Sequence, residues 1–270
     1  MPRVSANSLA LCQAADELGK AVDALTFSAP VTHVYNPLRY ARRAHHAYLR
    51  KAPTGRSEAV FLGMNPGPWG MAQTGVPFGE IDLVRNFIGV EAVVDRPPNE
   101  HPKRPIEGFD CKRSEVSGRR LWGYVRQRFG NSAAFFKKNF VINYCPLVFM
   151  EASGRNRTPD KLPADERDSL QLLCDEHLCR VLDILNPKVA VAVGTYAETC
   201  LKRCLASSAV LAGDSSRQPH ESRRKRLWRI ARILHPSPAS PAANRDWAGT
   251  VERQLAEAKI WTNGTTESLE

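Results

Sequence analysis

The chain has 270 residues, 43% of them hydrophobic and 24% charged, which suffices for one sizeable core and falls short of two full catalytic domains. Its mean hydropathy is -0.36 and no apolar run approaches the roughly 20 residues that cross a bilayer, so we expect neither a transmembrane segment nor a membrane partner. Lys and Arg number 38 against 28 Asp and Glu, and the net charge of +10 favours a nucleic-acid partner, with plain surface solubility as the alternative.

Residues 1–26 begin the chain with a helical pattern. Gln13, Asp16, Glu17 and Lys20 interrupt its apolar residues, so the segment lacks the continuous apolar stretch of a signal peptide. We expect an N-terminal helical arm on a protein that is not secreted.

Four apolar, β-branched runs that stop abruptly at Gly, Asn or His predict strands. They are residues 58–65, 140–143, 188–194 and 229–235. The first three are almost wholly apolar, as is typical of strands covered on both faces in a parallel sheet. The helical patterns between them cover residues 117–129, 163–185 and 196–205. This alternation predicts an α/β fold, a three-layer αβα sandwich with a mostly parallel central sheet.

Three further segments predict irregular structure. Residues 91–115 carry four prolines and little periodicity, which indicates a long surface connection. Residues 213–226 are polar and basic and predict a mobile loop, and residues 262–270 predict a disordered tail.

The seven cysteines are an odd number without local metal-binding spacing. Neither Cys174 with Cys179 nor Cys200 with Cys204 forms the C-x-x-C pattern of a zinc or iron–sulfur site. We expect no metal site and no disulfide framework, a reducing compartment, and cysteines that serve as small core residues.

Polar residues end three of the predicted strands, namely Asn65, Asn143 and His235. Ligands of parallel α/β sheets bind where the carboxyl ends of the strands converge, so these positions predict one pocket lined by two amides and an imidazole. A lone histidine at a strand end is more often structural, but the stiff His235-Pro-Ser-Pro238 sequence favours a functional one.

Residues 63–79 place five glycines and three prolines directly after a predicted strand. Glycine lets a backbone approach a ligand closely and proline fixes the turns, so the segment predicts a rigid ligand loop. It matches neither the phosphate-binding loop nor the dinucleotide-binding motif. An unusual structural turn is the alternative.

These segments resemble the uracil-DNA glycosylase superfamily, and within it the single-strand-selective monofunctional branch. The matching motifs are Gly63-Met-Asn-Pro-Gly-Pro68 with its extension to Gly79, Asn143-Tyr-Cys-Pro-Leu147, His235-Pro-Ser-Pro238, His101-Pro-Lys-Arg-Pro105, Ser114-Glu-Val-Ser-Gly118 and Ser153-Gly-Arg-Asn156. The resemblance runs from Phe27 to Leu255 and implies a uracil-DNA glycosylase-like domain over residues 27–261.

Two departures from neighbouring branches sharpen the resemblance. Asn65 stands where the branch with the strongest catalysis has an acidic residue, and the four cysteines that hold an iron–sulfur cluster in the thermophile-type branches are absent. The basic stretch at residues 213–226 looks longer than the family usually shows, and its role stays open.

The resemblance implies a role for each side chain of the predicted pocket. Asn65 would orient the attacking water, and His235 would donate a hydrogen bond to uracil O2 as negative charge develops there. Phe78 would stack on the extruded base, and Asn143 would read N3–H and O4 at its edge.

Four more residues complete the implied substrate-binding set: Gly63, Met64, Gly67 and Met71. In this family the loop with Gly67 and Met71 lies near C5 of the base and holds a water that a polar 5-substituent can replace. A core-filling role is the alternative for Met71.

The same resemblance implies a loop that enters the duplex where the base has left. Its DNA-binding residues are Pro236, Ser237, Pro238, Ala239, Ser240, Pro241, Asn244 and Arg245. Candidate contacts to the DNA backbone are Lys137, Lys138, Arg155, Arg157 and the run Arg223–Arg226. Plain solvation is the alternative for Arg245, and the basic run is a backbone contact, a nuclear import signal or a solvated loop.

The implied function is a monofunctional DNA glycosylase of base excision repair. It would hydrolyse the N-glycosidic bond of uracil, 5-hydroxymethyluracil and 5-formyluracil in single- and double-stranded DNA and leave an abasic site, without metal or organic cofactor. We expect a monomer, a downstream abasic-site endonuclease as partner, and residence in the nucleus, or in the cytoplasm of a bacterial source. The alternatives are a glycosylase with hypoxanthine or xanthine preference and a catalytically silent protein that binds damaged DNA.

Overall fold

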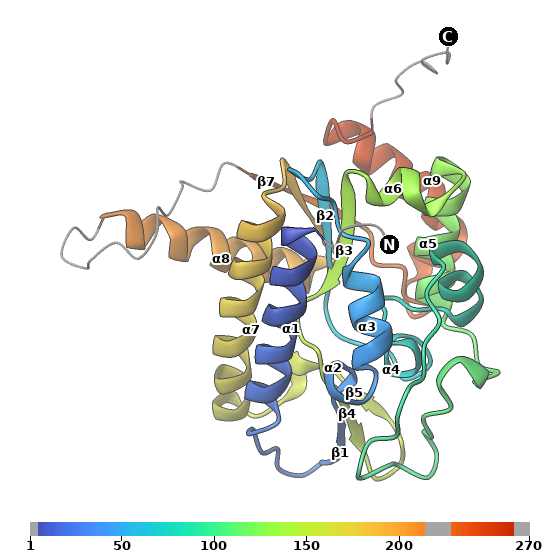
Figure 1. The fold of residues 1–270 in the computed structure, drawn as a ribbon. Helices are drawn as coiled ribbons and strands as arrows, with labels where there is room; N and C mark the ends of the chain where they lie inside the picture. Colours follow the sequence, from blue (N-terminus) through green and yellow to red (C-terminus); the bar gives the residue numbers. More distant parts are fainter. Residues whose placement is uncertain (1–4, 214–227, 262–270) are drawn as a thin grey trace.

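The computed structural model describes residues 5–213 and 228–261, and its centre is a four-stranded parallel sheet (Figure 1). The strand order is β3 (Asn139–Asn143), β2 (Ala59–Gly63), β6 (Val189–Val193) and β7 (Arg229–Ile233). The two middle strands, β2 and β6, are buried at every residue, which explains why their sequences are apolar without alternation. All four predicted strands are confirmed.

Helices cover both faces of this sheet (Figure 1). One layer contains α1 (Ala6–Val22), α7 (Ala164–Leu185) and α8 (Thr195–Gly213), and the other contains α5 (Val116–Phe129), α6 (Ser132–Phe136) and α9 (Pro241–Glu257). α8 packs on β6, α9 on β7 and α6 on β3. The predicted three-layer sandwich is confirmed, and α8 continues beyond its predicted end at residue 205.

Short helical segments fill the connections between strands. They are α2 (Pro37–Tyr40), α3 (Arg42–Leu49), α4 (Met71–Thr74) and the helical turns Leu83–Ile88, Gly108–Asp110 and Pro159–Lys161. Tyr48 of α3 donates a hydrogen bond of 2.7 Å to the carbonyl of Val141 and stacks on Phe140, with ring centroids 4.8 Å apart. α3 therefore lies against the edge strand β3.

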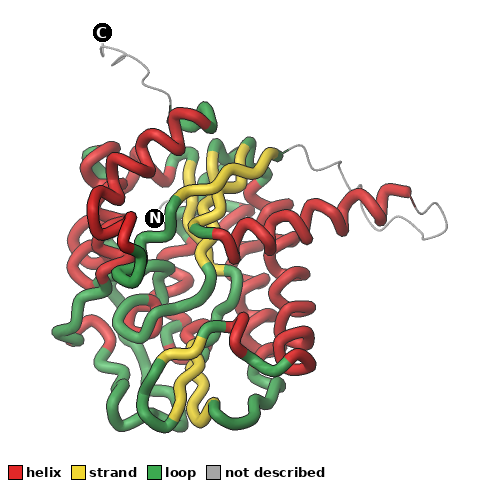
Figure 2. Tube along the Cα trace, turned by 180° about the vertical axis from the view of Figure 1, so that it is seen from behind, coloured by secondary structure: helices red, strands yellow, loops and turns green. Residues whose placement is uncertain are grey.

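A small antiparallel sheet, separate from the main one in Figure 2, was not predicted. It pairs β1 (Val31–Tyr35) with β4 (Val148–Glu151), and β4 with β5 (Asn156–Arg157). The sequence signal is weak because β5 has two residues and β1 mixes buried with exposed positions.

α1, the predicted N-terminal arm, lies along α7 and buries Leu11 and Leu18 in the core. The domain boundary at residue 27 stays a prediction. Residues 214–226 of the predicted basic loop and the predicted tail at residues 262–270 lie outside the described residues. Across the described ranges, every helix is too short or too polar to span a bilayer.

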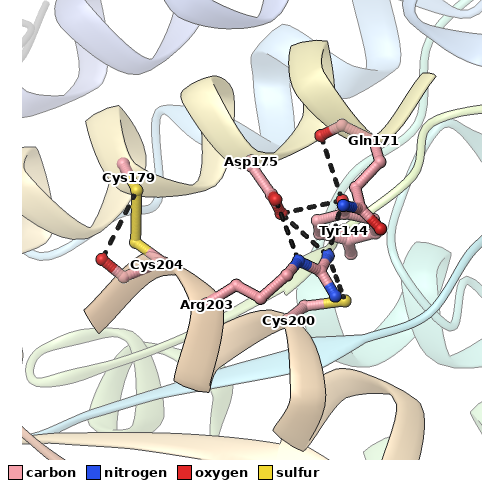
Figure 3. A network of polar contacts seen from close by, with 7 residues as sticks. All are labelled: Tyr144, Gln171, Asp175, Cys179, Cys200, Arg203 and Cys204. Carbon is pink, nitrogen blue, oxygen red and sulfur yellow. Dashed lines mark hydrogen bonds and ion pairs between the residues drawn. A yellow bond between two sulfur atoms is a disulfide. The ribbon is translucent and has the colours of Figure 1, made fainter. Parts of the chain in front are cut away.

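A polar network joins α7 and α8 to the segment that follows β3 (Figure 3). The guanidinium of Arg203 donates to both carboxylate oxygens of Asp175, at 3.0 and 2.9 Å, and to the hydroxyl of Tyr144 at 3.0 Å. The Tyr144 hydroxyl in turn donates to Asp175 at 2.8 Å. Because Tyr144 follows Asn143 directly, the network fixes the chain at the end of β3.

The cysteines differ in part from the expectation of core thiols. Cys145, Cys174 and Cys200 are buried as free thiols, as predicted. The sulfurs of Cys179 and Cys204 form a disulfide between α7 and α8, with Cα atoms 5.8 Å apart (Figure 3). One pair therefore departs from the expected core thiols, because local spacing does not show which cysteines two packed helices bring together.

Asp175→Asn should lower the free energy of unfolding by about 1 to 3 kcal/mol, because the half-buried guanidinium of Arg203 loses its paired carboxylate. Urea unfolding of the purified variant measures the loss. The control is Glu176→Gln, which removes the neighbouring exposed carboxylate of the same helix and should change stability by less than about 0.5 kcal/mol. Equal losses in the two variants would contradict the role given to the network.

Candidate active site

Four strand ends lie along one edge of the parallel sheet. Gly63 at the end of β2 is in register with Asn143 at the end of β3. On the other side, Gly194 follows β6 and donates a backbone hydrogen bond of 3.0 Å to Ile233, the last residue of β7. His235 comes two residues later. The structure thus places Asn143, Asn65 and His235 at the carboxyl ends of the parallel strands, in the order of β3, β2 and β7 across the sheet.

Gly63 makes room for two of the predicted pocket residues. A Cβ atom built on Gly63 would lie 2.6 Å from Cε2 of Phe78 and would also overlap Oδ1 of Asn143. The ring centroid of Phe78 is 6.3 Å from that of His235. Asn143, Phe78 and His235 therefore converge on one small region, and residue 63 must be glycine for this to happen.

Phe78 is held in an uncommon backbone conformation. Its φ of 53° lies in the left-handed region, which a bulky residue adopts only when its surroundings enforce it. Gly118 of α5 supports the position from below, because a Cβ atom at 118 would overlap the carbonyl of Phe78. The strain is therefore tied to the placement of the aromatic ring.

Asn143 presents an amide whose oxygen lacks a protein partner. Its Nδ2 donates to the sulfur of Met71 at 3.3 Å, whereas Oδ1 is buried and has no hydrogen-bond donor among the described residues. The following backbone is fixed, since the amide of Tyr144 donates to Gly63 at 2.9 Å and that of Cys145 donates to Met64 at 2.8 Å. A buried acceptor of this kind is costly unless a ligand supplies a donor.

His235 is a neutral imidazole in this setting. Burial lowers the pKa of its side chain, and its Nδ1 accepts a hydrogen bond of 3.1 Å from the backbone N–H of Ser237. An accepting Nδ1 leaves the ring proton on Nε2, so His235 can donate from Nε2 without carrying a charge.

The amide of Asn65 is oriented by two backbone carbonyls. Its Nδ2 lies 3.3 Å from the carbonyl oxygen of Leu147 and 3.3 Å from that of Pro66. With the nitrogen engaged, Oδ1 is the atom of Asn65 that can hold a water.

Glu115, immediately before α5, was missed by the sequence reasoning. Its carboxyl lies against the backbone of Gly67 and Gly70, where a Cβ on either glycine would overlap it, and Oε2 is buried without a hydrogen-bond partner among the described residues. Burial, and secondly the nearby charge of Glu80, raise the pKa of Glu115 to about 7. The available signal was its place in the Ser114-Glu-Val-Ser-Gly118 motif, to which no role was assigned.

The predicted DNA-binding loop differs from expectation in where it ends. Ser240 caps α9 by accepting from the N–H of Ala243, so Pro241, Asn244 and Arg245 lie in the first turns of that helix. The exposed residues of the loop itself are Pro238 and Ala239, whereas Pro236 is buried at its base. Arg245 is exposed.

Two of the predicted backbone-contacting cations, Lys137 and Lys138, lie away from these strand ends. Lys137 and Lys138 precede β3, so they lie at the opposite end of the sheet, and Arg157 is paired with Glu151 at 3.0 Å. Arg155 is exposed after β4, and residues 223–226 fall outside the described part of the chain.

Two arginines that the sequence reasoning passed over flank the loop after β2. The guanidinium carbons of Arg104 and Arg113 lie 5.1 and 5.4 Å from the ring centroid of Trp69. The two cations come from residues 91–115, which were predicted to form a long surface connection, and Arg104 lies in the motif His101-Pro-Lys-Arg-Pro105.

A cavity of about 40 Å³ approaches the site from the core side and is lined in part by Met71, Pro77 and Asn143. Asn65, Phe78 and His235 do not line it. Within the described ranges, no group of three His, Cys, Asp or Glu side chains is arranged to hold a metal ion.

Replacement of Glu115 by Gln should change how stability depends on pH. The folded-state pKa of about 7 exceeds the ordinary value of 4.5, so the unfolded chain loses this proton first as pH rises. The parent protein then loses up to about 3 kcal/mol of stability between the two values, and the Glu115→Gln variant escapes this loss.

Chemical unfolding of both proteins across this pH window measures the effect. The advantage of the Gln variant should grow with pH and then level off. Glu257→Gln, an exposed carboxylate of α9, is the control and should open no such gap. A difference that stays constant across the window would contradict the buried, protonated state of Glu115.

Comparison with known proteins agrees with this geometry. A family model of the uracil DNA glycosylase superfamily matches residues 50–261. Relatives from Rattus norvegicus and Bos taurus, each described as a single-strand selective monofunctional uracil-DNA glycosylase, are 44% identical over 233 residues, which is 86% of this chain and 78% and 80% of theirs.

A solved structure shares the fold at low sequence identity. The crystal structure of wild-type SMUG2 from Pedobacter heparinus has a TM-score of 0.63 and 16% identity, over 92% of this chain and 97% of that one. By its match over most of its length and its close relatives, this chain belongs to the uracil-DNA glycosylase superfamily, in the family of single-strand selective monofunctional uracil-DNA glycosylases.

Proposed function

We propose that this protein is a monofunctional DNA glycosylase that hydrolyses the N-glycosidic bond of uracil in DNA. The observation that carries the proposal is the side chain of Asn143, whose buried oxygen lacks a donor and whose nitrogen has a weak thioether acceptor beside Phe78. Uracil N3–H supplies the donor and uracil O4 supplies a better acceptor.

Cytosine presents the opposite pattern at the same edge. Its N3 accepts and its N4 donates, so both groups of Asn143 would face a like partner. Each buried mismatch costs about 1 to 3 kcal/mol, which suffices to reject cytosine by tens to hundreds of fold per contact.

The bond to uracil breaks with positive charge on the sugar and negative charge on the departing base. His235 donates from Nε2 to uracil O2, and a neutral imidazole does this without having to give up a proton. Asn65 holds the attacking water at Oδ1, which suffices because an oxocarbenium-like sugar is strongly electrophilic. An amide cannot take a proton near neutral pH, so turnover is modest.

The substrate range includes pyrimidines with a polar group at C5. The sulfur of Met71 accepts a hydrogen bond from the amide of Asn143, and Gly67 precedes it in the same loop. This contact supports a position of C5 beside the loop. The hydroxyl of 5-hydroxymethyluracil or the oxygen of 5-formyluracil can replace an ordered water there and take over its hydrogen bonds. The methyl of thymine would displace the water without replacing those hydrogen bonds.

The partner is DNA, both single-stranded and double-stranded. Pro238 and Ala239 are exposed in the loop that follows His235, which suits a stiff wedge, and the net charge of +10 favours a polyanion. The product is an abasic site, which calls for an abasic-site endonuclease as the next enzyme. Residence in the nucleus is in keeping with the mammalian origin of the relatives, and the monomeric state is part of the proposal.

Purified protein should release uracil and 5-hydroxymethyluracil from otherwise identical oligonucleotides, and Asn65→Ala should slow release by about 100-fold or more, because the water loses its anchor. Single-turnover base release measures both. The variant should still bind abasic DNA, since Asn65 is not part of the DNA-facing loop.

Hypoxanthine and xanthine oligonucleotides complete the panel. Preferential release of either purine would favour the related glycosylase, and binding of uracil-DNA without any release would favour a silent damage-binding protein. Unchanged release by Asn65→Ala would remove Asn65 from the mechanism.

Asn143→Asp should narrow the preference for uracil over cytosine by at least about tenfold, because the carboxylate repels O4 and no longer offers an N–H. Competition between uracil and cytosine oligonucleotides measures the ratio. The matched control is Asn131→Asp, the same substitution at the exposed cap of α6, where a carboxylate caps as well as an amide. Unchanged selectivity in Asn143→Asp would refute the reading of the base edge.

A further inference from the structure

Arg120 of α5 bonds to two carbonyl oxygens of the loop of residues 236–240 and to one side chain of α9, the helix that follows the loop. Its Nη1 donates to the carbonyl of Pro236 at 3.0 Å and to that of Ser237 at 3.2 Å, and its Nη2 donates to Oδ1 of Asn244 at 2.8 Å. One guanidinium thus holds both the base of the loop and the first turn of α9.

The hydrogen bonds continue from Arg120 to the exposed tip. Asn244 uses its other amide atom, Nδ2, to donate to the carbonyl of Pro238 at 2.8 Å. The backbone N–H of Ala239 is bound within the loop, to Oγ of Ser237 at 3.1 Å. Asn244 was predicted to contact DNA, but both ends of its amide are hydrogen-bonded within the protein, to Arg120 and to Pro238.

We propose that Arg120 is a positioning residue that keeps this loop stiff and thereby sets activity on paired DNA. The inference rests on the proposed function. Displacing a paired base costs a few kcal/mol of stacking and pairing, and a loop that must first be ordered loses about 1 kcal/mol or more per residue in backbone entropy. Single-stranded DNA offers no partner stack to displace, so it needs the stiff loop far less.

The site chemistry does not depend on this guanidinium. The N–H of Ser237 bonds to His235, whereas Arg120 bonds to the carbonyl of Ser237, so the imidazole keeps its partner when Arg120 is lost. Release from single strands therefore reports on the pocket and on folding, and release from duplexes reports in addition on the loop.

The test compares single-turnover uracil release from one oligonucleotide, single-stranded and in duplex, by four proteins: the parent, Arg120→Ala, Arg120→Lys and Arg119→Ala. Arg119 is exposed on the same helix, so Arg119→Ala removes the same charge as Arg120→Ala without touching the loop. Arg120→Ala should lower the duplex rate about 10- to 100-fold relative to the single-strand rate, because three charge-assisted hydrogen bonds are lost. Arg119→Ala should leave the ratio of the two rates within about twofold.

Arg120→Lys separates positioning from simple charge. A lysine keeps the charge but cannot bond three acceptors in a fork, so its duplex rate should fall nearly as far as that of Arg120→Ala. Full duplex activity in Arg120→Lys would overturn the proposal and favour a phosphate contact. Equal loss of activity on single-stranded and duplex DNA in Arg120→Ala would also overturn it and favour a general structural role.

Asn244→Ala keeps the proposal falsifiable if Arg120→Ala does not fold. It cuts the link to Pro238 while leaving Arg120 bonded to the base of the loop, and it should reproduce part of the selective duplex loss. An unchanged ratio in Asn244→Ala would contradict the inference. Absence of release from either substrate by the parent would instead defeat the proposed function.

Discussion

The site depends on the absence of side chains at two strand ends. Gly63 ends β2 and Gly194 follows β6, and these middle strands lie between the one that carries Asn143 and the one that leads to His235. A Cβ on Gly63 would overlap Asn143 and Phe78, and one on Gly194 would lie 3.1 Å from Cβ of His235, at a φ of 91° that favours glycine. The amide, the aromatic ring and the imidazole can share one region because the two central strands leave it open.

The beginning of α5 supports three parts of this region at once. Glu115 lies against the Gly67–Gly70 backbone, Gly118 allows contact with the carbonyl of Phe78, and Arg120 holds the loop after His235. A single rigid element thus relates the loop after β2, the ring of Phe78 and the loop after His235 to each other. Sites built on such elements hold their geometry better than sites built on loops alone.

Features that depend on local pattern were predictable from the sequence, and features that depend on tertiary partners were not. Continuous apolar runs and their abrupt polar ends located the sheet and the positions of Asn65, Asn143 and His235. Nothing local distinguishes Arg120 from Arg119, or shows that Glu115 is buried. Lys137 and Lys138 precede β3, a position at the far end of the sheet that a count of charges does not reveal.

The contact between the amide of Asn143 and the sulfur of Met71 bears on how a base would be bound in the proposed mechanism. A thioether is a weak acceptor, so it fixes the rotamer of the amide without competing strongly for it. In the proposed mechanism an arriving base would exchange this weak hydrogen bond for one to its carbonyl oxygen, and the side chain would not have to turn first. A pocket of this kind would be preorganised, and on the proposed function it would discriminate between bases with little rearrangement of the protein.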